Sequence, residues 1–401
     1  MTVTPALLAE AAGLAPDLVQ LRRRLHTVPE VGLHLPLTQA AVLEALDGLD
    51  LEVSTGSALS SVVAVLRGAR PGPVVLLRAD MDALPVTEDS AEPVRSAHEG
   101  AMHACGHDLH TAGLVGAARL LHAHRDELAG SVVLMFQPGE EGDAGARLMI
   151  DEGVLDAAGE RVVAAYALHV TSALLPAGLV ASRPGTMLAA ADTMTVTVRG
   201  RGGHGSMPHL AADPVTGAAE IVLAVQAAVT RQFDALDPVV VSVGRISAGT
   251  TDNVIPETAE LAATVRTFSE ETHAVVAGRL TRVVEKIAEA HGLTAEVSYR
   301  PGYPVTVNTP GEVGRVARVS TALVGAQGFW EAPRPIPGSE DFSYVLAEVP
   351  GAYLGLGATP ADRDPATAAY NHAPQATFDE RVLPQAAALL AGLAMDRLAE
   401  G

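Results

Sequence analysis

The sequence predicts an α/β protein in which a mostly parallel sheet, flanked by helices, carries an inserted ferredoxin-like βαββαβ unit. In the first and last parts of the chain, short apolar β-rich segments alternate with helical segments, which is typical of a parallel sheet. The middle third has a different order of elements. Hydrophobic residues make up 48% of the chain but aromatic residues only 3%, which favours helix-rich α/β packing over an all-β sandwich.

Length, charge and cysteine content limit the possible classes of protein. The 401 residues exceed what one core normally holds, so we expect two domains. A formal charge of −20 argues against nucleic acid and anionic membranes as partners. One cysteine excludes an intramolecular disulfide framework and fits a reducing compartment. The N-terminus lacks the pattern of a signal peptide, so we expect a soluble, cytoplasmic protein.

The first and last parts of the chain contain the elements of the parallel sheet. A helix is expected over residues 5–27, with Arg22, Arg23 and Arg24 on a solvated face, and another over residues 109–124. The expected buried strands are short, apolar and bounded by glycine and proline; they cover residues 61–66, 74–77, 131–136, 162–168 and 352–356.

The middle third reads as a βαββαβ unit. In chain order its expected elements are a strand at 193–198, a helix at 214–233, strands at 239–246 and 259–268, a helix at 270–290 and a strand at 295–299. Because the βα alternation resumes afterwards, we interpret this unit as an insertion. The predicted domains are residues 1–187 and 303–401 for the domain with the parallel sheet, and 188–302 for the inserted domain.

The segment from His103 to Asp108 holds the single cysteine between two histidines. Thiolate and imidazole suit zinc and similar metals, and Gly106 lets the backbone bring Cys105 and His107 toward one ion. Their spacing fits a loop before the next helix, with Asp108 near its N-terminus. A lone cysteine is otherwise usually buried packing. A closed structural zinc site is not expected, because there is no second cysteine.

Polar residues follow the expected strands. Asp80 and Asp82 follow the strand at 74–77, Glu140 and Glu141 follow 131–136, and His169 follows 162–168; His372 lies in the loop after the last strand. Ligands of open α/β sheets bind beyond the carboxyl ends of the strands, so these side chains should converge on Cys105 and His107. Such a set can hold two metal ions.

Adjacent Glu140 and Glu141 have two interpretations. An isolated pair of glutamates is ordinarily a solvated acidic turn. At a strand end in a metal site, one carboxylate can bind the metal while the other accepts a proton from water whose pKa the metal lowers. The second interpretation predicts a hydrolytic reaction.

Seven segments in order resemble the motifs of one family. They are residues 78–85, 102–108, 136–141, 168–170, 202–205, 253–256 and 338–342. Together they resemble the co-catalytic metallohydrolases that include aminoacylases and related carboxypeptidases. The most similar branch is that of hippurate hydrolases, N-acyl-amino-acid amidohydrolases and indole-acetyl-amino-acid hydrolases. The resemblance covers nearly the whole chain.

The resemblance implies a role for each matching residue. Two divalent ions per subunit, with zinc, manganese, cobalt and nickel as candidates, would be bound by Cys105, His107, Glu141, His169 and His372, with Cys105 as the bridge. Glu140 would be the general base, and Asp82 would orient the site. His204 would stabilise the oxyanion from a partner subunit, while Asn253 and Arg266 would bind the substrate carboxylate. The inserted domain would form a homodimer and close over the substrate.

Some of these residues also have structural interpretations. His204 lies among glycines and could be a turn histidine, and Arg266 in a strand is ordinarily an exposed cross-strand partner. We interpret His103, His110 and His209 as structural or supporting residues rather than ligands.

Three functions remain open at this point. The resemblance implies an amidohydrolase that cleaves N-acyl amino acids, such as hippurate or N-acetyl amino acids, to a carboxylic acid and a free amino acid. The enzymatic alternative is a metallopeptidase of the same family, a dipeptidase or a carboxypeptidase. A non-catalytic metal-binding or ligand-binding protein is the third, and Glu140 beside Glu141 argues against it.

Overall fold

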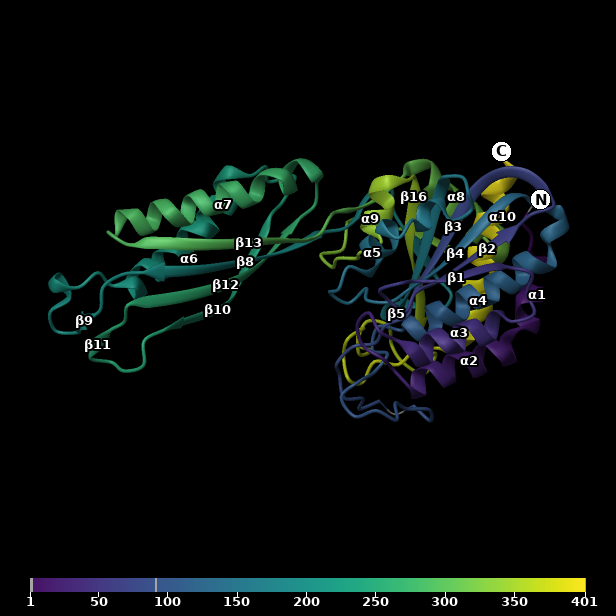
Figure 1. Cartoon of the computed structure of the whole chain (residues 1–401), viewed down its shortest axis with the longest axis horizontal. Coiled ribbons are helices and arrows are strands. Elements are labelled where there is room, and N and C mark those ends of the chain that lie inside the picture. The colour runs from purple at the N-terminus through teal and green to yellow at the C-terminus, as the bar shows by residue number, and fades with distance from the viewer. Residues whose placement is uncertain (1–2, 91, 401) are drawn as a thin grey trace. The chain divides into compact units, whose positions relative to one another are not determined.

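The computed structural model describes residues 3–90 and 92–400, which form two compact units (Figure 1). Unit 1 contains the residues up to Gly185, Val307–Arg334 and the residues from Tyr344 onward; unit 2 contains Thr186–Thr306 and Pro335–Ser343. The segment Pro335–Ser343 thus lies with unit 2, whereas the sequence-based division assigns it to residues 303–401.

The sheet of unit 1 has eight strands among the described residues. In spatial order they are β1 (Glu52–Thr55), β2 (Val62–Arg67), β4 (Ala129–Gln137), β3 (Arg70–Asp80), β5 (Val162–Pro176), β16 (Gly351–Thr359), β6 (Val180–Ser182) and β15 (Phe329–Glu331). The central neighbours β4, β3, β5 and β16 pair in parallel. Their continuous apolar runs are buried on both faces, as parallel strands require. The predicted α/β class with a mostly parallel sheet is therefore confirmed.

Helices cover both faces of this sheet (Figure 1). On one face, α4 (His107–Ala123) and α10 (Leu383–Ala399) pack on the central strands and α8 (Pro310–Val324) packs on β16, β6 and β15, with α1 (Pro5–Gly13) and α2 (Ala15–Thr27) outside these helices. The short helices α5 (Gly145–Asp151) and α9 (Ser343–Glu348) lie on the other face. Among the described residues, Glu380–Ala399 is the one helical segment that is long and apolar enough to cross a membrane. Of its most apolar stretch, 72% is buried inside the protein, as in the core helix of a globular domain.

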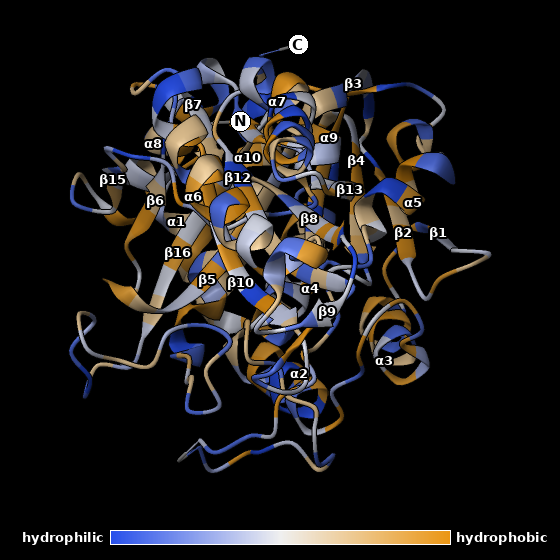
Figure 2. Ribbon diagram, turned by 90° about the vertical axis from the view of Figure 1, so that its left-hand side faces the viewer, coloured by the Kyte–Doolittle hydropathy of each residue, from blue (hydrophilic) through white to orange (hydrophobic). Residues whose placement is uncertain are grey.

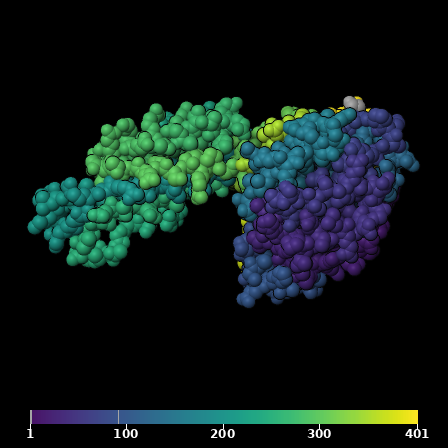
Figure 3. All heavy atoms as spheres, in the orientation of Figure 1, coloured from purple at the N-terminus to yellow at the C-terminus, as the bar shows by residue number. Residues whose placement is uncertain are grey.

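The N-terminal region differs from the prediction of one helix over residues 5–27. The chain forms α1 and α2, which are separated at Leu14. Pro16 explains the break, because proline has no N–H to continue the hydrogen-bond ladder of the first helix. A further helix, α3 (Pro36–Leu46), was not predicted. In Figure 2, α2 and α3 each carry hydrophilic and hydrophobic residues, as surface helices do, and in Figure 3 purple N-terminal atoms form much of the visible surface of unit 1.

Unit 2 has the expected βαββαβ order. Its elements are β8 (Ala190–Arg199), α6 (Pro214–Gln232), β10 (Val240–Ala248), β12 (Thr258–Thr267), α7 (Glu270–Ala290) and β13 (Thr294–Tyr303). The strands form an antiparallel sheet in the order β10-β12-β8-β13, the ferredoxin-like arrangement. Alternate residues of β8, including Met194 and Val196, are buried in one cluster with Ile221 of α6 and Leu280 of α7.

Short elements complete the chain. They are β7 (Gly185–Leu188), β9 (Gly203–His204), β11 (Val254–Ile255), β14 (Thr306–Asn308) and the 3-10 turns Arg125–Glu127, Val154–Asp156, Pro208–Leu210 and Glu380–Val382.

Candidate metal centre

The candidate centre lies at the carboxyl ends of the parallel strands of unit 1. Strand β3 ends at Asp80, two residues before Asp82, and β4 ends at Gln137, before Glu140 and Glu141. His169 belongs to β5 itself. The parallel register β3–β4 and β3–β5 places these strand ends at the same edge of the sheet, so their side chains meet there.

The structure brings the expected ligand atoms of unit 1 together. Their donor atoms form groups in which all lie within 4.8 Å of one another: Cys105, His107 and His169; Cys105, Glu141 and His372; and His107, Glu140 and Glu141. Cys105 Sγ is 3.2 Å from His169 Nε2, and His372 Nε2 is 3.1 Å from Glu141 Oε1. Thiolate, imidazole and carboxylate are ligands that suit borderline divalent metals.

His107 provides a direct test of whether the cluster fits a cation. Its ring is buried, and within the described part of the chain neither of its nitrogens makes a hydrogen bond. The nearest carboxylate oxygens, from Asp82 and Asp80, are 3.6 and 3.7 Å away, beyond hydrogen-bond distance. A buried polar atom without a partner is costly, so this imidazole fits a divalent ion better than it fits the packed protein.

Gly106 sets the positions of Cys105 and His107. It adopts a left-handed conformation with φ +84° as the N-cap of α4, and a Cβ there would lie 2.5 Å from Val170 Cγ2. His107 is the first residue of α4 rather than part of the loop before it, so the helix begins two residues earlier than expected. Cys105 and His107 thus lie on either side of the turn.

Asp82 holds the two glutamates. Its Oδ1 accepts the backbone N–H of Glu140 and its Oδ2 accepts that of Glu141, both at 3.0 Å. The carboxylate is buried, with 1% of its residue surface exposed. Because both oxygens bind the same loop, Asp82 fixes where the two glutamates enter the cluster.

The neighbouring imidazoles change the acidity of the thiol and the carboxyl group. Burial alone would raise the pKa of Cys105, but His169, His107 and His372 hold it well below its ordinary value. Hydrogen bonds to Cys105 and Glu141 raise the pKa of His372 to about 10. Burial raises the pKa of Glu141. The cluster therefore stabilises the anionic thiolate that a metal requires.

His110 is paired with Asp80 beside the candidate ligands. Its Nδ1 is 2.5 Å from Asp80 Oδ1, and its Nε2 accepts the backbone N–H of Val170 at 2.8 Å. Nε2 is therefore the unprotonated nitrogen, and Nδ1–H donates to Asp80. Asp80, whose role the sequence left undecided, thus contacts His110 through Oδ1, while its Oδ2 lies 2.6 Å from Arg78 Nη1.

The prediction that Arg22 is solvated is wrong. Arg22 is 2% exposed, its Nε lies 2.8 Å from Asp108 Oδ2, and His26 Nδ1 lies 2.8 Å from the same oxygen. The sequence did contain a signal: Arg22 is four residues after buried Leu18 and three before buried Leu25, so it lies on the inward stripe of α2.

His204 and Asn253 lie together in unit 2. His204 on β9 pairs with Val254 on β11, and the N–H of Gly205 donates to Asn253 O at 2.8 Å. His204 is exposed, and its Nδ1 accepts the backbone N–H of Ser206 at 3.1 Å. In neutral His204 the proton is therefore on Nε2.

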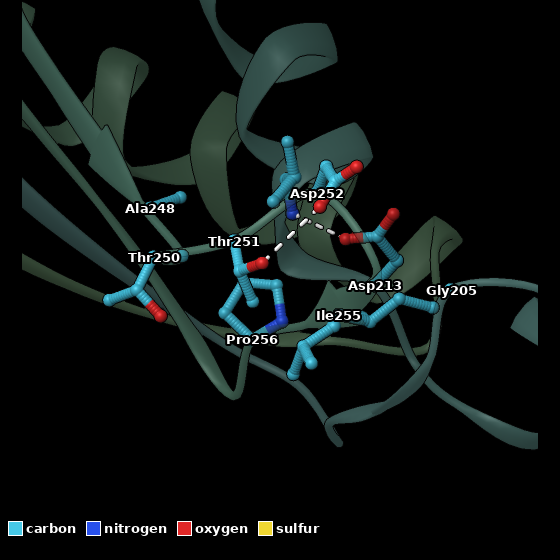
Figure 4. Close-up of a pocket in the computed structure, with 11 residues that line it drawn as sticks. Gly205, Asp213, Ala248, Thr250, Thr251, Asp252, Ile255 and Pro256 are labelled. Atoms are coloured by element: carbon cyan, nitrogen blue, oxygen red, sulfur yellow. Dashed lines mark hydrogen bonds between the residues drawn. The ribbon is translucent and has the colours of Figure 1, made fainter.

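A pocket of about 550 Å³ in unit 2 adjoins these two residues along the chain (Figure 4). Its lining includes Gly205, which follows His204, and Asp252 and Val254, which flank Asn253. The side chains drawn in Figure 4 are mainly hydroxyl, carboxyl and small apolar groups. The pocket was not predicted, because its lining comes from separate loops.

Arg266 lies half-buried on β12. Its Nη1 donates to Val265 O at 3.1 Å and to the hydroxyl of Thr264. Burial lowers its pKa. No carboxylate within the described residues forms a salt bridge with Arg266, so it is not the cross-strand ion-pair partner that a strand arginine commonly is.

Comparison with known proteins decides the family. Residues 76–396 match the profile of Peptidase family M20/M25/M40. The chain belongs to this family. It is 38% identical over 387 residues to IAA-amino acid hydrolase ILR1-like 2 of Arabidopsis thaliana, covering 96% of this chain and 85% of that protein. It is also 38% identical over 344 residues to thermostable carboxypeptidase 2 of Saccharolobus solfataricus, covering 85% of each.

A solved structure of the same family has a similar fold. The YXEP protein of Bacillus subtilis, a dinuclear metal binding peptidase from the M20 family, superposes with a TM-score of 0.83 and 32% sequence identity. The match covers 97% of this chain and 99% of the other. The family resemblance stated from the motifs is confirmed by these findings.

Proposed function

We propose that the protein is a metal-dependent amidohydrolase that cleaves N-acyl amino acids to a carboxylic acid and a free amino acid. The observation that carries this proposal is a buried carboxylate, Glu140, in a cluster with His107 and Glu141. A binding protein would not need a second glutamate there. The names of the Arabidopsis hydrolase and the archaeal carboxypeptidase support cleavage of an amide bond next to an amino acid.

The metal ions would be held by the residues that meet at the strand ends. Two divalent ions, from zinc, manganese, cobalt or nickel, would be bound by Cys105, His107, Glu141, His169 and His372. When bound, they would lower the pKa of a water molecule and polarise the amide carbonyl of the substrate. The relative described as a dinuclear metal binding peptidase supports two ions rather than one.

Glu140 would then move the proton. Its carboxylate would accept a proton from the attacking water and return it to the leaving amine, which must be protonated to depart. Asp82 contributes by position, because it binds the backbone N–H groups of Glu140 and Glu141 and so fixes both carboxylates. One glutamate thus serves the proton transfer while its neighbour serves the metal.

Unit 2 would recognise the substrate. Arg266 has a half-buried guanidinium without a carboxylate partner among the described residues, which supports binding of the carboxylate of the amino acid, together with Asn253. His204 would donate from Nε2 to the oxyanion, reaching in from a partner subunit. We propose that unit 2 both forms a homodimer and closes over the substrate. The single, buried cysteine supports a cytoplasmic location.

A metallopeptidase is the second candidate, and the carboxypeptidase relative favours it. A free dipeptide and an N-acyl amino acid share the amide bond and the free carboxylate. They differ in the free amino group of the dipeptide. Only the N-acyl side of the substrate therefore separates the two functions.

The test is a substrate panel assayed for release of free amino acid. N-acetyl, N-benzoyl and longer N-acyl amino acids would be compared with dipeptides, after chelation and after addition of each of the four metals. The proposal expects metal-dependent cleavage of N-acyl amino acids. Cleavage of dipeptides alone would establish the peptidase, and no cleavage by the metal-loaded protein would contradict both.

A further inference from the structure

The side-chain amide of Asn371 joins the two segments that carry Cys105 and His169. Its Nδ2 donates to Cys105 O at 3.1 Å and to Val170 O at 3.0 Å, and it lies 3.8 Å from Cys105 Sγ. Cys105 precedes α4, and Val170 follows His169 in β5. One amide therefore connects two ligand-bearing segments that are far apart in the sequence.

The other end of this amide is also occupied. Asn371 Oδ1 accepts the backbone N–H of Ser172 at 2.9 Å, and the hydroxyl of Ser172 lies 3.1 Å away. With the oxygen facing a backbone donor and the nitrogen facing two backbone carbonyls, a flipped amide would lose these bonds. The orientation of Asn371 is therefore set by three separate backbone groups.

Asn371 also precedes a third candidate ligand, His372. This residue adopts a left-handed conformation with φ +72°, which is unusual for a residue other than glycine. Its backbone N–H donates to Ala104 O at 2.9 Å, next to Cys105. A backbone conformation of this kind persists only where surrounding contacts hold it, and the hydrogen bonds of Asn371 supply such contacts.

The same contacts orient His169. Val170 is held on both sides, because its N–H donates to His110 and its carbonyl accepts from Asn371. His169 Nδ1 lies 2.8 Å from that carbonyl, so it is the donating nitrogen. His169 Nε2 is then the nitrogen that faces Cys105 Sγ and can bind a metal.

We propose that Asn371 is a positioning residue of the metal centre, which holds the backbone around Cys105, His169 and His372 so that these three ligands face one place before a metal ion binds. The proposal rests on the metal dependence of the proposed function. Loss of a residue that orients metal ligands typically weakens metal affinity about 10- to 100-fold. We expect a loss of that size here.

Two variants and one matched control test this role. Asn371→Asp keeps the size and the acceptor for Ser172, but it replaces the Nδ2 donor by an oxygen that repels two carbonyls. Asn371→Leu removes both ends of the amide. The control is Asn308→Leu: Asn308 is buried, donates to Ser182, Arg183 and Tyr353, and accepts from the N–H of Tyr353 at 2.7 Å. None of its partners is a candidate ligand.

The readout is binding of Co²⁺ to the metal-free full chain. The dissociation constant would be measured by competition with a chelator, and the thiolate-to-cobalt absorption band would report the environment of Cys105. Far-UV circular dichroism would establish that each variant is folded. We expect both Asn371 variants to bind Co²⁺ about 10- to 100-fold more weakly with an altered band, while Asn308→Leu keeps the wild-type affinity and band.

Each result decides the proposal. Wild-type affinity and absorption in the Asn371 variants would overturn it, and so would an equal loss in Asn308→Leu. If Asn371→Leu does not fold, Asn371→Asp gives the answer, and an unfolded Asn371→Asp would show that the amide serves the fold in general. Failure of the proposed function is distinguishable, because the wild type itself would then bind no Co²⁺ or would hydrolyse nothing when loaded.

Discussion

Arg22 Nε lies 2.8 Å from Asp108 Oδ2, and both side chains are almost completely buried. Asp108 is the second residue of α4, directly after His107, so this ion pair ties the helix that begins at a candidate ligand to α2. His26 binds the same carboxylate oxygen. The buried charge network of Arg22, His26 and Asp108 therefore fixes the first turn of α4, which begins at the candidate ligand His107.

Replacement of Arg22 by methionine is expected to be strongly destabilising. Breaking a buried pair leaves an uncompensated charge, which typically costs about 3–5 kcal/mol, and His26 limits the loss to about 3 kcal/mol. Urea unfolding of the metal-free wild type and of Arg22→Met measures this loss in the free energy of unfolding. The control is Arg24→Met, whose pair with Glu44 is exposed, with an expected loss below about 1 kcal/mol. Equal losses would contradict the role of the network.

His26 predicts a pH dependence of stability. Burial alone would lower its pKa, but hydrogen bonds with Asp108 and Glu88 raise the pKa to about 9. An unfolded histidine has a pKa of about 6.5, so the folded state binds this proton more tightly. The contribution, of order 3 kcal/mol, is fully present below about pH 6.5 and is lost as the pH rises toward 9.

The comparison of wild type with His26→Gln isolates this contribution. Their difference in free energy of unfolding, measured without metal, should be largest near pH 6 and should shrink toward pH 9. Other titrating groups are common to both proteins and cancel in the difference. If the difference in free energy of unfolding stays constant between pH 6 and pH 9, Asp108 and Glu88 do not raise the pKa of His26 in the folded protein.

Gly106 is expected to tolerate no side chain. In Gly106→Ala, the left-handed φ costs about 1–2 kcal/mol, and the contact with Val170 Cγ2 adds to this cost. We expect lower stability together with weaker Co²⁺ binding. The control is Gly314→Ala in α8, where a Cβ meets nothing within 4 Å and the gain in helix propensity is up to about 1 kcal/mol. A Gly106→Ala variant with wild-type stability and wild-type Co²⁺ affinity would show that the left-handed turn at this position is not required.

Arg266 is expected to act on the carboxylate of the substrate. Loss of a charged hydrogen bond worth about 1.5–3 kcal/mol should lower kcat/KM of Arg266→Met about 10- to 100-fold for N-acyl amino acids. The carboxamide analogues of the same substrates should show no such difference between variant and wild type. Arg245→Met serves as control, because Arg245 pairs with exposed Glu260. Equal losses on both substrate types would exclude this role.

The candidate metal ligands could be grouped from the sequence because each lies near the carboxyl end of a recognisable strand or at the start of a helix. The parallel order of β3, β4 and β5 then brings Asp82, Glu141 and His169 to one edge. Arg22 was misjudged because charge suggests exposure, although its spacing from Leu18 and Leu25 places it on the inward stripe of α2. Its partner Asp108 is 86 positions away, and no local pattern identifies that partner. The contacts of Asn371 were missed for the same reason: they join the loop after β16 to β5 and to the segment before α4, which meet only in the fold.

The central claim is that Glu140 moves the proton in a metal-dependent hydrolysis. The most direct measurement compares kcat and bound metal in the wild type and in Glu140→Gln, which keeps the shape but cannot accept the proton. The account predicts unchanged metal content and a kcat lowered about 10²- to 10⁴-fold on N-acyl amino acids. A Glu140→Gln enzyme that holds its metal and retains the wild-type kcat would contradict it.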